Sequence, residues 1–453
     1  MRSQIHTKDP FYGQIFRLTL PIVLQNLLSA AVSSADVVML NSVGQSAISA
    51  VSLASQYTSV FFMILYGLGT GVTMLSAQYW GKKDVHAIEL IQGIALRFSV
   101  AIAALFSVCA MTIPRQMMIL FTNDPELIAL GTSYLRIVSF SYLFWCFSEV
   151  YLATLRSVER VTISTLLNAL ALGLNVCLNA VFIFGFFGAP KLGVAGVALA
   201  TSISRGIQLL FCLAVSQSSK DVRLRLSYIF VQNKVLFHDF VHLSLPALGN
   251  DLVWSVAFSM YSVILGHLGS DMVAANSIVV VVRNFATVFC FGLASVSTIW
   301  LGKQIGEGNM ETAKKDASRL VRLSVYAGIL GGVFVLIASP FVIGYVSLTE
   351  QATHYLKYML LMNTYYISGT ALNTTLIAGV FRAGGDSRFG FICDTIDMWV
   401  YAVPLGFFSA FVLKLPHLVV YFLLCTDEFV KWPWVIRHYR SYKWLHNVTK
   451  EYE

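Results

Sequence analysis

The chain has 453 residues, of which 57% are hydrophobic and only 12% are charged, and its formal net charge is +8. Soluble domains carry roughly 25% charged residues, so this composition excludes an ordinary water-soluble globular protein. A span needs about 20 apolar residues, and a helix with its connection takes roughly 35–40, so the length accommodates about twelve membrane-spanning helices.

Long apolar segments follow one another along the chain. Examples are residues 18–40, 48–75, 161–188, 192–216 and 329–348. Strands of a membrane β-barrel are short and alternate polar with apolar residues, whereas these segments are continuously apolar. We therefore expect an all-α integral membrane protein with twelve transmembrane helices.

Basic residues are distributed unevenly between the two sides of these spans. If the chain starts in the cytoplasm, the outside turns hold little more than Arg115, Lys191 and Lys414, and nearly all other Lys and Arg residues lie inside. This positive-inside pattern predicts a multi-pass protein of the cell (inner) membrane with both termini in the cytoplasm. The basic excess is then an orientation signal, and we expect no nucleic acid partner.

The two halves of the sequence resemble each other at a constant offset, which is the separation of Pro21 from Pro246. Leu-Thr-Leu-Pro ending at Pro21 corresponds to Leu-Ser-Leu-Pro ending at Pro246, and Gly81 corresponds to Gly306. Because each half holds an even number of spans, both halves enter the membrane in the same direction, which predicts two parallel six-helix repeats with a cavity between them.

The expected domain organisation follows from this repeat. We expect an N-terminal lobe at 1–216, a cytoplasmic connector at 217–239, a C-terminal lobe at 240–437 and a cytoplasmic tail at 438–453. Transport would occur by alternating access, with one lobe rocking against the other. No pattern indicates oligomerisation, and we expect a monomer in the lipid bilayer.

Three motifs, in order, resemble the hallmarks of the multidrug and toxic compound extrusion (MATE) family. They are Leu-x-Leu-Pro at the start of each half, the glycine-rich end of the second span at 67–81 with its echo at 292–308, and Phe-Arg-Ala-Gly-Gly-Asp-Ser-Arg at 381–388. The resemblance covers essentially the whole chain. It implies a V-shaped two-lobe antiporter that exports amphipathic, often cationic, small organic compounds in exchange for Na⁺ or H⁺, without a cofactor.

An ionisable residue inside a span is a functional hypothesis by default, and Asp36 is the clearest one. Asp36 lies about 27 Å along the first span, and Asn179 reaches the same depth in the fifth span, on one helical face with Asn175. Thr201, in the sixth span, lies about 12 Å below the outer face. We therefore expect these four side chains to converge inside the N-terminal lobe. One carboxylate with neutral oxygens suits a monovalent cation, and the carboxyl group can instead take up a proton.

The resemblance implies the same set of residues. One branch of the family uses a first-span Asp, a fifth-span Asn, a fifth-span acid four residues later and a sixth-span Thr, which correspond to Asp36, Asn175, Asn179 and Thr201. The chain departs from that pattern at Asn179, where an acid is expected, and this leaves the choice between Na⁺ and H⁺ open. In the alternative interpretation, Asp36 is an interface residue and the asparagines are interhelical hydrogen bonders.

The C-terminal lobe has its own charged residues inside predicted spans. Asp394 and Asp397, in the eleventh span, either form an inner gate network with Arg388 or Arg382 or make plain interfacial ion pairs. Arg283 stands alone in the eighth span, is expected to face the cavity or a partner, and is grouped with Asp394 and Asp397 as a candidate gate or second polar network.

Four residues are candidates for the substrate cavity because they offer polarizable or π surfaces to organic cations. They are Trp254, Met260, Tyr261 and Tyr365. Trp254 also stands where a second branch of the family has a seventh-span acid. In the alternative interpretation these side chains face lipid or the core.

Two other functions compete with export. A flippase for lipid-linked saccharides or lipids of the related superfamily would have a cavity richer in arginine, whereas mid-membrane cations here are chiefly Arg283 and Arg205. A membrane enzyme would need a nucleophile–base set, a phosphate loop or a metal cluster, and the sequence contains no such motif. We therefore do not expect an enzyme. The seven scattered cysteines have no metal-ligand spacing, so we expect no metal beyond a coupling Na⁺.

Overall fold

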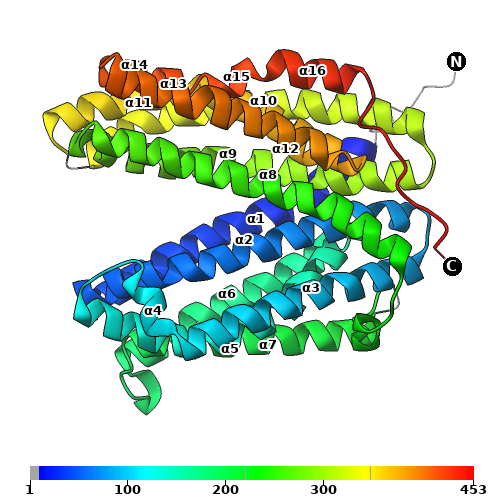
Figure 1. Cartoon of the computed structure of the whole chain (residues 1–453), viewed down its shortest axis with the longest axis horizontal. Helices are drawn as coiled ribbons and strands as arrows, with labels where there is room; N and C mark the ends of the chain where they lie inside the picture. The colour runs from blue at the N-terminus through cyan, green and yellow to red at the C-terminus, as the bar shows by residue number, and fades with distance from the viewer. Residues whose placement is uncertain (1–9, 220, 347, 453) are drawn as a thin grey trace, which may run out of the picture. The chain divides into compact units, whose positions relative to one another are not determined.

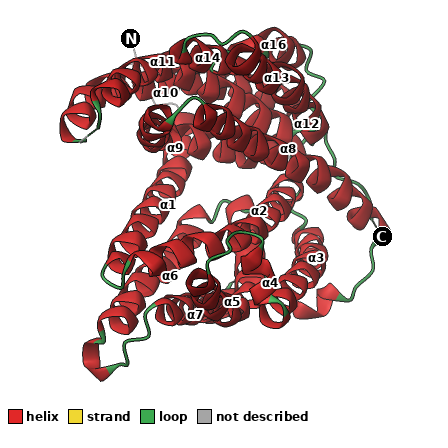
Figure 2. Ribbon diagram, turned by 60° about the vertical axis from the view of Figure 1, so that its left-hand side comes forward, coloured by secondary structure: helices red, strands yellow, loops and turns green. Residues whose placement is uncertain are grey.

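The computed structural model describes residues 10–219, 221–346 and 348–452, and these consist of helices joined by turns and loops (Figures 1 and 2). Residues 1–9 of the predicted N-terminal lobe, Lys220 of the predicted connector, Ser347 and Glu453 lie outside the described residues. A helical chain suits this composition, because a helix satisfies its own backbone hydrogen bonds where no water is available. The predicted all-α fold class is confirmed.

The described residues of the N-terminal half form seven α-helices and two short 3₁₀ segments. They are α1 (Pro10–Asn41), α2 (Gln45–Gly81), α3 (Val85–Thr112), α4 (Pro114–Ile119), α5 (Pro125–Ser157), α6 (Val161–Phe184), η1 (Phe186–Gly188), α7 (Val194–Ser218) and η2 (Leu226–Ile229). The C-terminal half contains α8 (Lys234–His267), α9 (Ser270–Gly306), α10 (Met310–Tyr345), α11 (Glu350–Thr374), η3 (Thr375–Phe381), α12 (Ser387–Thr395), η4 (Ile396–Ala402), α13 (Val403–Phe407), η5 (Phe408–Val412), α14 (His417–Leu424), α15 (Asp427–Val430) and α16 (Trp432–Arg440).

Ten helices in the described part of the chain are long and apolar enough to cross a membrane. They are α1, α2, α3, α5, α6, α7, α8, α9, α10 and the continuous segment from α12 to η5. We assign the two remaining spans of the predicted twelve to α11 with η3 and to the segment from α14 to α16. The last of these segments is more polar because it carries Asp427, Glu428 and Lys431.

The helix boundaries show the same offset between the two halves as the sequence does. Helices α2, α3 and α5 begin at residues 45, 85 and 125, and their counterparts α9, α10 and α11 begin at 270, 310 and 350, which is the offset that separates Pro21 from Pro246. The turns follow the same rule. Gly44 and Gly269, which precede α2 and α9, have φ angles of 131° and 124°, and Lys83 and Gly308 both have positive φ (62° and 81°). The two halves therefore share the same turn geometry.

The described residues separate into two compact units, and the boundary falls within helices rather than in loops. The N-terminal unit comprises Leu24–Leu248 together with the end of the tail from Lys450, and the C-terminal unit comprises the chain up to Val23 together with Gly249–Thr449. The divisions lie just after Pro21 in α1 and just after Pro246 in α8. A proline inside a helix removes one backbone hydrogen bond and weakens the helix at that point, so these are natural places for a helix to pass from one unit to the other.

Glycines allow the exchanged helix segments to pack closely in each unit. In the N-terminal unit, a Cβ atom at Gly67 would lie 2.5 Å from Cδ1 of Leu248 in α8. In the C-terminal unit, a Cβ atom at Gly292 would lie 2.8 Å from Cγ2 of Val23 in α1. At the offset of the repeat, Gly292 corresponds to Gly67 and Leu248 corresponds to Val23, so the two contacts are repeat equivalents. The glycine motifs of the sequence thus serve close helix packing, as small residues do in membranes.

Each unit has its own apolar core. In the N-terminal unit, α5 packs against α2, α3 and α7, around buried residues that include Phe61, Leu65 and Tyr142. In the C-terminal unit, α9 packs against α10, α11 and η3, beside buried residues that include Tyr261 and Tyr366. Both cores hold polar side chains within spans, and these form the candidate sites.

The C-terminal tail contributes to both units. Trp444 is fully buried in the C-terminal unit and donates from Nε1 to the carbonyl of Tyr439 over 3.1 Å. In the N-terminal unit, Lys450 makes an ion pair with Asp239 over 2.5 Å, and the Tyr452 hydroxyl donates to the Asp84 carboxylate over 2.8 Å. Although it has no regular secondary structure after Trp444, the tail is therefore an ordered part of the fold.

Candidate functional site

The four residues predicted to converge in the N-terminal unit form one hydrogen-bonded chain. The Asn179 amide in α6 donates to Oδ1 of Asp36 in α1 over 2.7 Å and to Oδ1 of Asn175 over 3.3 Å. The Asn175 amide in turn donates to Oγ1 of Thr201 in α7 over 3.2 Å, and that hydroxyl donates to the carbonyl of Val197. The predicted convergence is confirmed, whereas its role in ion coupling stays a prediction.

Local helix geometry explains this arrangement. Asn175 and Asn179 are four residues apart and therefore lie one turn apart on the same face of α6. Helices α6 and α7 pack directly against each other, which brings Thr201 beside Asn175. Asp36 lies toward the end of α1, so its carboxylate meets the later of the two asparagines.

The burial of these groups differs in a way that matters for a cation. The Asn179 side chain is fully buried, and its Oδ1 atom has no hydrogen-bond partner within the described residues. Asp36 is only partly buried. A buried amide oxygen without a donor is unfavourable in a protein interior, and a cation would satisfy it. The donor set of one carboxylate, two amide groups and one hydroxyl consists of hard oxygen ligands, which fits Na⁺.

A second polar chain lies nearer the start of α6 and was not predicted as a site. Gln208 of α7 donates to Oδ1 of Asn168 over 3.3 Å and accepts from Arg205 over 2.9 Å. The Arg205 guanidinium lies 4.1 Å from the ring centroid of Trp145, a cation–π distance. The polar face of α6 thus continues from Asn179 to Asn168, and the spacing of seven residues between Asn168 and Asn175 is the signal that connects the two chains.

In the C-terminal unit, Asp394 and Asp397 meet a lysine rather than the arginines considered from the sequence. The Lys431 ammonium lies 3.2 Å from Asp394 Oδ1, 3.6 Å from Asp397 Oδ2 and 3.3 Å from Glu428 Oε2. Asn250 links Asp394 to Arg382, because its amide donates to Asp394 over 2.6 Å and its oxygen accepts from Arg382 over 3.0 Å. We call Asp394, Asp397, Asp427, Glu428 and Lys431 the Lys431 cluster.

The sequence indicated only part of the Lys431 cluster. Glu428 and Lys431 are three residues apart, and this spacing is a local signal for their ion pair. Their contact with Asp394 and Asp397 was missed, because it joins two spans that are distant in the sequence. The signal available in the sequence was that the eleventh and twelfth spans each carry two acidic residues, and that the twelfth also carries a lysine.

Arg283, predicted to share the network of Asp394 and Asp397, has aromatic neighbours instead. Its guanidinium lies 5.0 Å from the ring centroid of Phe258 and 5.8 Å from that of Tyr366. It is partly exposed. The two aromatic rings are cation–π partners of Arg283. Whether Arg283 also faces a cavity stays a prediction.

The residues predicted for the substrate cavity occupy different environments. Trp254 packs on Phe258 with ring centroids 4.3 Å apart, and Met260 is partly buried on the same helix. The Tyr261 hydroxyl donates to Asp427 over 2.9 Å, which makes it a neighbour of the Lys431 cluster. Tyr365 packs on Phe429, and its buried hydroxyl has no hydrogen-bond partner within the described residues. A substrate role for these four residues stays a prediction.

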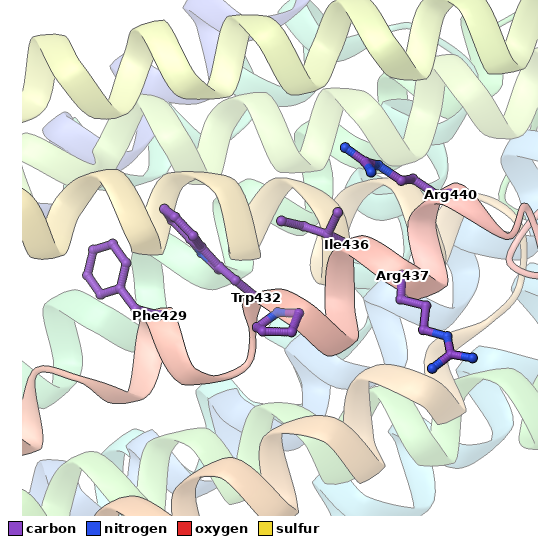
Figure 3. A pocket seen from close by; sticks show the side chains of 6 residues that line it. Phe429, Trp432, Ile436, Arg437 and Arg440 are labelled. Atoms are coloured by element: carbon purple, nitrogen blue, oxygen red, sulfur yellow. The ribbon is translucent and has the colours of Figure 1, made fainter.

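A hollow of about 520 Å³ lies on the last span (Figure 3). Its lining comes from α15 and α16, namely Phe429, Trp432, Pro433, Ile436, Arg437 and Arg440. Aromatic and basic side chains of this kind are typical of the membrane–water interface. The lining contains no acidic group that would hold a coupling cation, and none of the residues predicted for a site belongs to it.

Comparison with known proteins places these observations in a family. The MatE family model matches residues 21–181 and again 246–408, so that each match begins at the proline of one repeat. The chain is 25% identical to the probable multidrug resistance protein YoeA of Bacillus subtilis, over 92% of this chain and 91% of that protein. It is 26% identical to the probable multidrug resistance protein NorM of Rhizobium meliloti, over 88% and 86% of the two chains.

Solved structures agree in fold. The bent form of the MATE transporter VcmN of Vibrio cholerae is similar with a TM-score of 0.85 at 15% identity, and the alignment covers 96% of this chain and 99% of that one. A MOP superfamily transporter of Pyrococcus furiosus gives a TM-score of 0.84 at 19% identity, over 95% and 96% of the two chains. The resemblance seen in the motifs is therefore confirmed, and the chain belongs to the MatE family of multi-pass membrane transporters.

Proposed function

We propose that this protein is a secondary active antiporter that exports amphipathic, often cationic, organic compounds in exchange for Na⁺ or H⁺ by alternating access. Membership in a family that includes multidrug efflux transporters supports the substrate class. The single observation that carries the coupling proposal is the hydrogen bond between Asn179 and Asp36, which joins a carboxyl group inside a span to a set of neutral oxygens. We expect the substrate to contact aromatic side chains, with Trp254 and Tyr365 as the first candidates.

The unpartnered oxygen of Asn179 favours Na⁺ over H⁺ as the coupling ion. A proton needs only the carboxyl group of Asp36, whereas Na⁺ uses several oxygen ligands. Turning the Asn179 amide over exchanges its oxygen and nitrogen, so its oxygen would face Asp36 and share the cation with it. The hydrogen bond from the Asn175 amide to the Thr201 hydroxyl remains in place when the Asn179 amide turns. This proposal also explains why an amide is tolerated at position 179, where a second acid is expected in the family branch that the motif resembles.

The helix that carries Asp36 offers a route from ion binding to movement. Asp36 belongs to the N-terminal unit, while the part of α1 up to Val23 belongs to the C-terminal unit. Pro21 lies just before this division and cannot donate a backbone hydrogen bond. We propose that a cation at Asp36 draws α1 toward α6 and changes how α1 bends near Pro21. The two conformations would then bind the ion with different affinities, so that ion binding favours one of them.

The proposed orientation follows from the charge distribution. We place both termini in the cytoplasm and the chain in the cell (inner) membrane, and the positive-inside pattern of basic residues supports this orientation. The described Arg437 and Arg440 at the end of the last helix belong to this pattern. We also propose that the protein acts as a monomer.

The proposal is tested by efflux of a cationic dye such as ethidium from cells that lack their own drug pumps, with Na⁺ and pH gradients imposed separately. We expect efflux to follow the Na⁺ gradient and Asp36→Asn to reduce the gradient-driven rate at least about tenfold, since a ligand charge worth roughly 1.5–3 kcal/mol is lost. Asp124→Asn is the matched control, because Asp124 caps α5 and asparagine caps a helix equally well.

The outcomes separate the hypotheses. If Asp36→Asn left efflux and its ion dependence unchanged, the coupling site would lie elsewhere. If efflux followed only the pH gradient, the coupling ion would be H⁺. If neither gradient drove dye export, the flippase alternative would become the better one, and transfer of a fluorescent lipid-linked saccharide across proteoliposomes would then be the next measurement.

A further inference from the structure

The Lys431 cluster places four carboxyl groups around one ammonium group inside the C-terminal unit. Asp394, Asp397, Asp427 and Glu428 are each at most 5% exposed, and Lys431 is 4% exposed. The nearby Arg382 makes an ion pair with Asp251 over 2.7 Å. Like charges this close in a buried site cannot all ionise together, so at least one of the four carboxyl groups must be neutral or bind a cation.

Hydrogen-bond donors distinguish three of these carboxyl groups from the fourth. Asp394 accepts from Asn250 on one oxygen and from Lys431 on the other. Asp427 accepts from the Tyr261 hydroxyl over 2.9 Å and from the backbone N–H of Glu428 over 2.8 Å. Both pairs of donors stabilise an ionised carboxylate.

Glu428 is held in the same way, by groups on α11. Its Oε2 accepts from the Asn373 amide over 2.6 Å and its Oε1 accepts from the Thr370 hydroxyl over 3.4 Å. It is also the ion-pair partner of Lys431 within its own span. Donors therefore reach both oxygens of three of the four acids.

Asp397 has no such donors. Within the described residues, neither Oδ1 nor Oδ2 of Asp397 has a hydrogen-bond partner, although both are buried, and Lys431 lies beyond hydrogen-bond distance at 3.6 Å. An ionised carboxylate without donors is strongly disfavoured in a buried site, whereas a protonated carboxyl group carries no charge. The groups that act electrostatically on Asp397 include one ammonium group and five acidic groups. They are Lys431, Asp427, Glu428, Asp394, Tyr261 and Cys393.

We propose that Asp397 is a proton-binding residue, and that the C-terminal unit therefore binds a proton at a site separate from Asp36. A proton suits the geometry better than a metal cation, because the Lys431 ammonium already occupies the place where Asp394, Asp397 and Glu428 converge. No group of three or more acidic, histidine or cysteine side chains within the described residues has the arrangement of a metal site. Gain or loss of this proton changes the charge facing Lys431, and the change reaches Arg382 through Asp394 and Asn250.

The proposal does not depend on the coupling ion at Asp36, and proton binding rather than transport tests it. The full-length protein in lipid nanodiscs is titrated while infrared difference spectra record the C=O stretch of protonated carboxyl groups. We expect the wild type to hold a protonated carboxyl group at neutral pH whose band disappears in alkaline solution. Asp397→Asn should remove this band, whereas Asp394→Asn, which removes a carboxylate with donors on both oxygens, should keep it. Asp36→Asn should also keep it, which separates this site from the proposed coupling site.

Thermal unfolding gives a second measurement that remains informative if one variant is poorly folded. Asparagine resembles a neutral carboxyl group, so we expect Asp397→Asn to unfold within about 2 °C of the wild type at neutral pH. Asp394→Asn breaks a buried ion pair and should lower the midpoint by roughly 5 °C or more. A band that persists in Asp397→Asn, or a loss of stability as large as that of Asp394→Asn, would show that Asp397 is ionised and would overturn the proposal.

Discussion

The Asn179 amide nitrogen lies 2.7 Å from the Asp36 carboxylate, in the N-terminal unit, and the two residues belong to different helices, α6 and α1. The contact joins the clearest ionisable residue of the first span to the position at which this chain carries an amide where the family motif has an acid. The chemistry of that pair therefore decides which ion this transporter is expected to use.

Replacing Asn179 by aspartate should change the coupling ion. Asn179→Asp places two carboxyl groups at hydrogen-bond distance, and two acids this close share one proton at neutral pH. We expect dye efflux in the variant to follow the pH gradient and to lose most of its response to Na⁺. The measurement is efflux under the two gradients applied in turn. An unchanged Na⁺ response would mean that position 179 does not contribute to ion choice.

Removing the hydroxyl of Thr201 should weaken ion binding while leaving the fold intact. Thr201→Val leaves the Asn175 amide without its acceptor, and a lost hydrogen bond of this kind is worth about 1 kcal/mol, so the Na⁺ concentration for half-maximal efflux should rise roughly fivefold. Thr201→Ser keeps the hydroxyl and serves as the control. Equal effects of valine and serine would assign the change to packing instead.

A methyl group at Gly71 should disturb helix packing in the N-terminal unit. A Cβ atom there would overlap the side chain of Ser244 in α8, and overpacking of this type typically destabilises a protein by about 1–3 kcal/mol. We expect Gly71→Ala to lower the unfolding midpoint and Ser244→Gly to restore part of the loss. Gly173 in α6 has no neighbouring atom within 4 Å of an added Cβ, so Gly173→Ala should be neutral or stabilising.

Removing one hydroxyl from the tail should loosen its attachment to the N-terminal unit. The Tyr452 hydroxyl donates to the Asp84 carboxylate, and the Asn233 amide donates to the Tyr452 carbonyl over 2.9 Å. Tyr452→Phe loses the bond to Asp84, which is worth about 1.5–3 kcal/mol because the acceptor is charged, and keeps the backbone carbonyl that accepts from Asn233. We expect faster cleavage of the tail by a carboxypeptidase. Tyr442→Phe, at an exposed position in the same tail, should leave the cleavage rate unchanged.

The membrane architecture could be predicted from the sequence because it depends on local properties. Apolar length, helix-forming backbone chemistry and the constant offset between the two halves are all readable along the chain, and the helix boundaries repeat that offset. The convergence of Asp36, Asn175, Asn179 and Thr201 could also be predicted, because the rise per residue places each side chain at a depth in the membrane. Depth is a one-dimensional quantity that a sequence contains.

What the sequence by itself determined is therefore the all-helical fold, the duplication and the level at which polar groups lie within each span. Only the tertiary structure decided which of these groups touch. Lys431 could have been satisfied within its own span by Glu428 alone, yet it also reaches Asp394 and Asp397, because the packing of the eleventh and twelfth spans sets their rotation about their axes. That rotation depends on side-chain packing between helices rather than on the sequence of either one, and it leaves Asp397 alone among the four acids without a hydrogen-bond donor within the described residues.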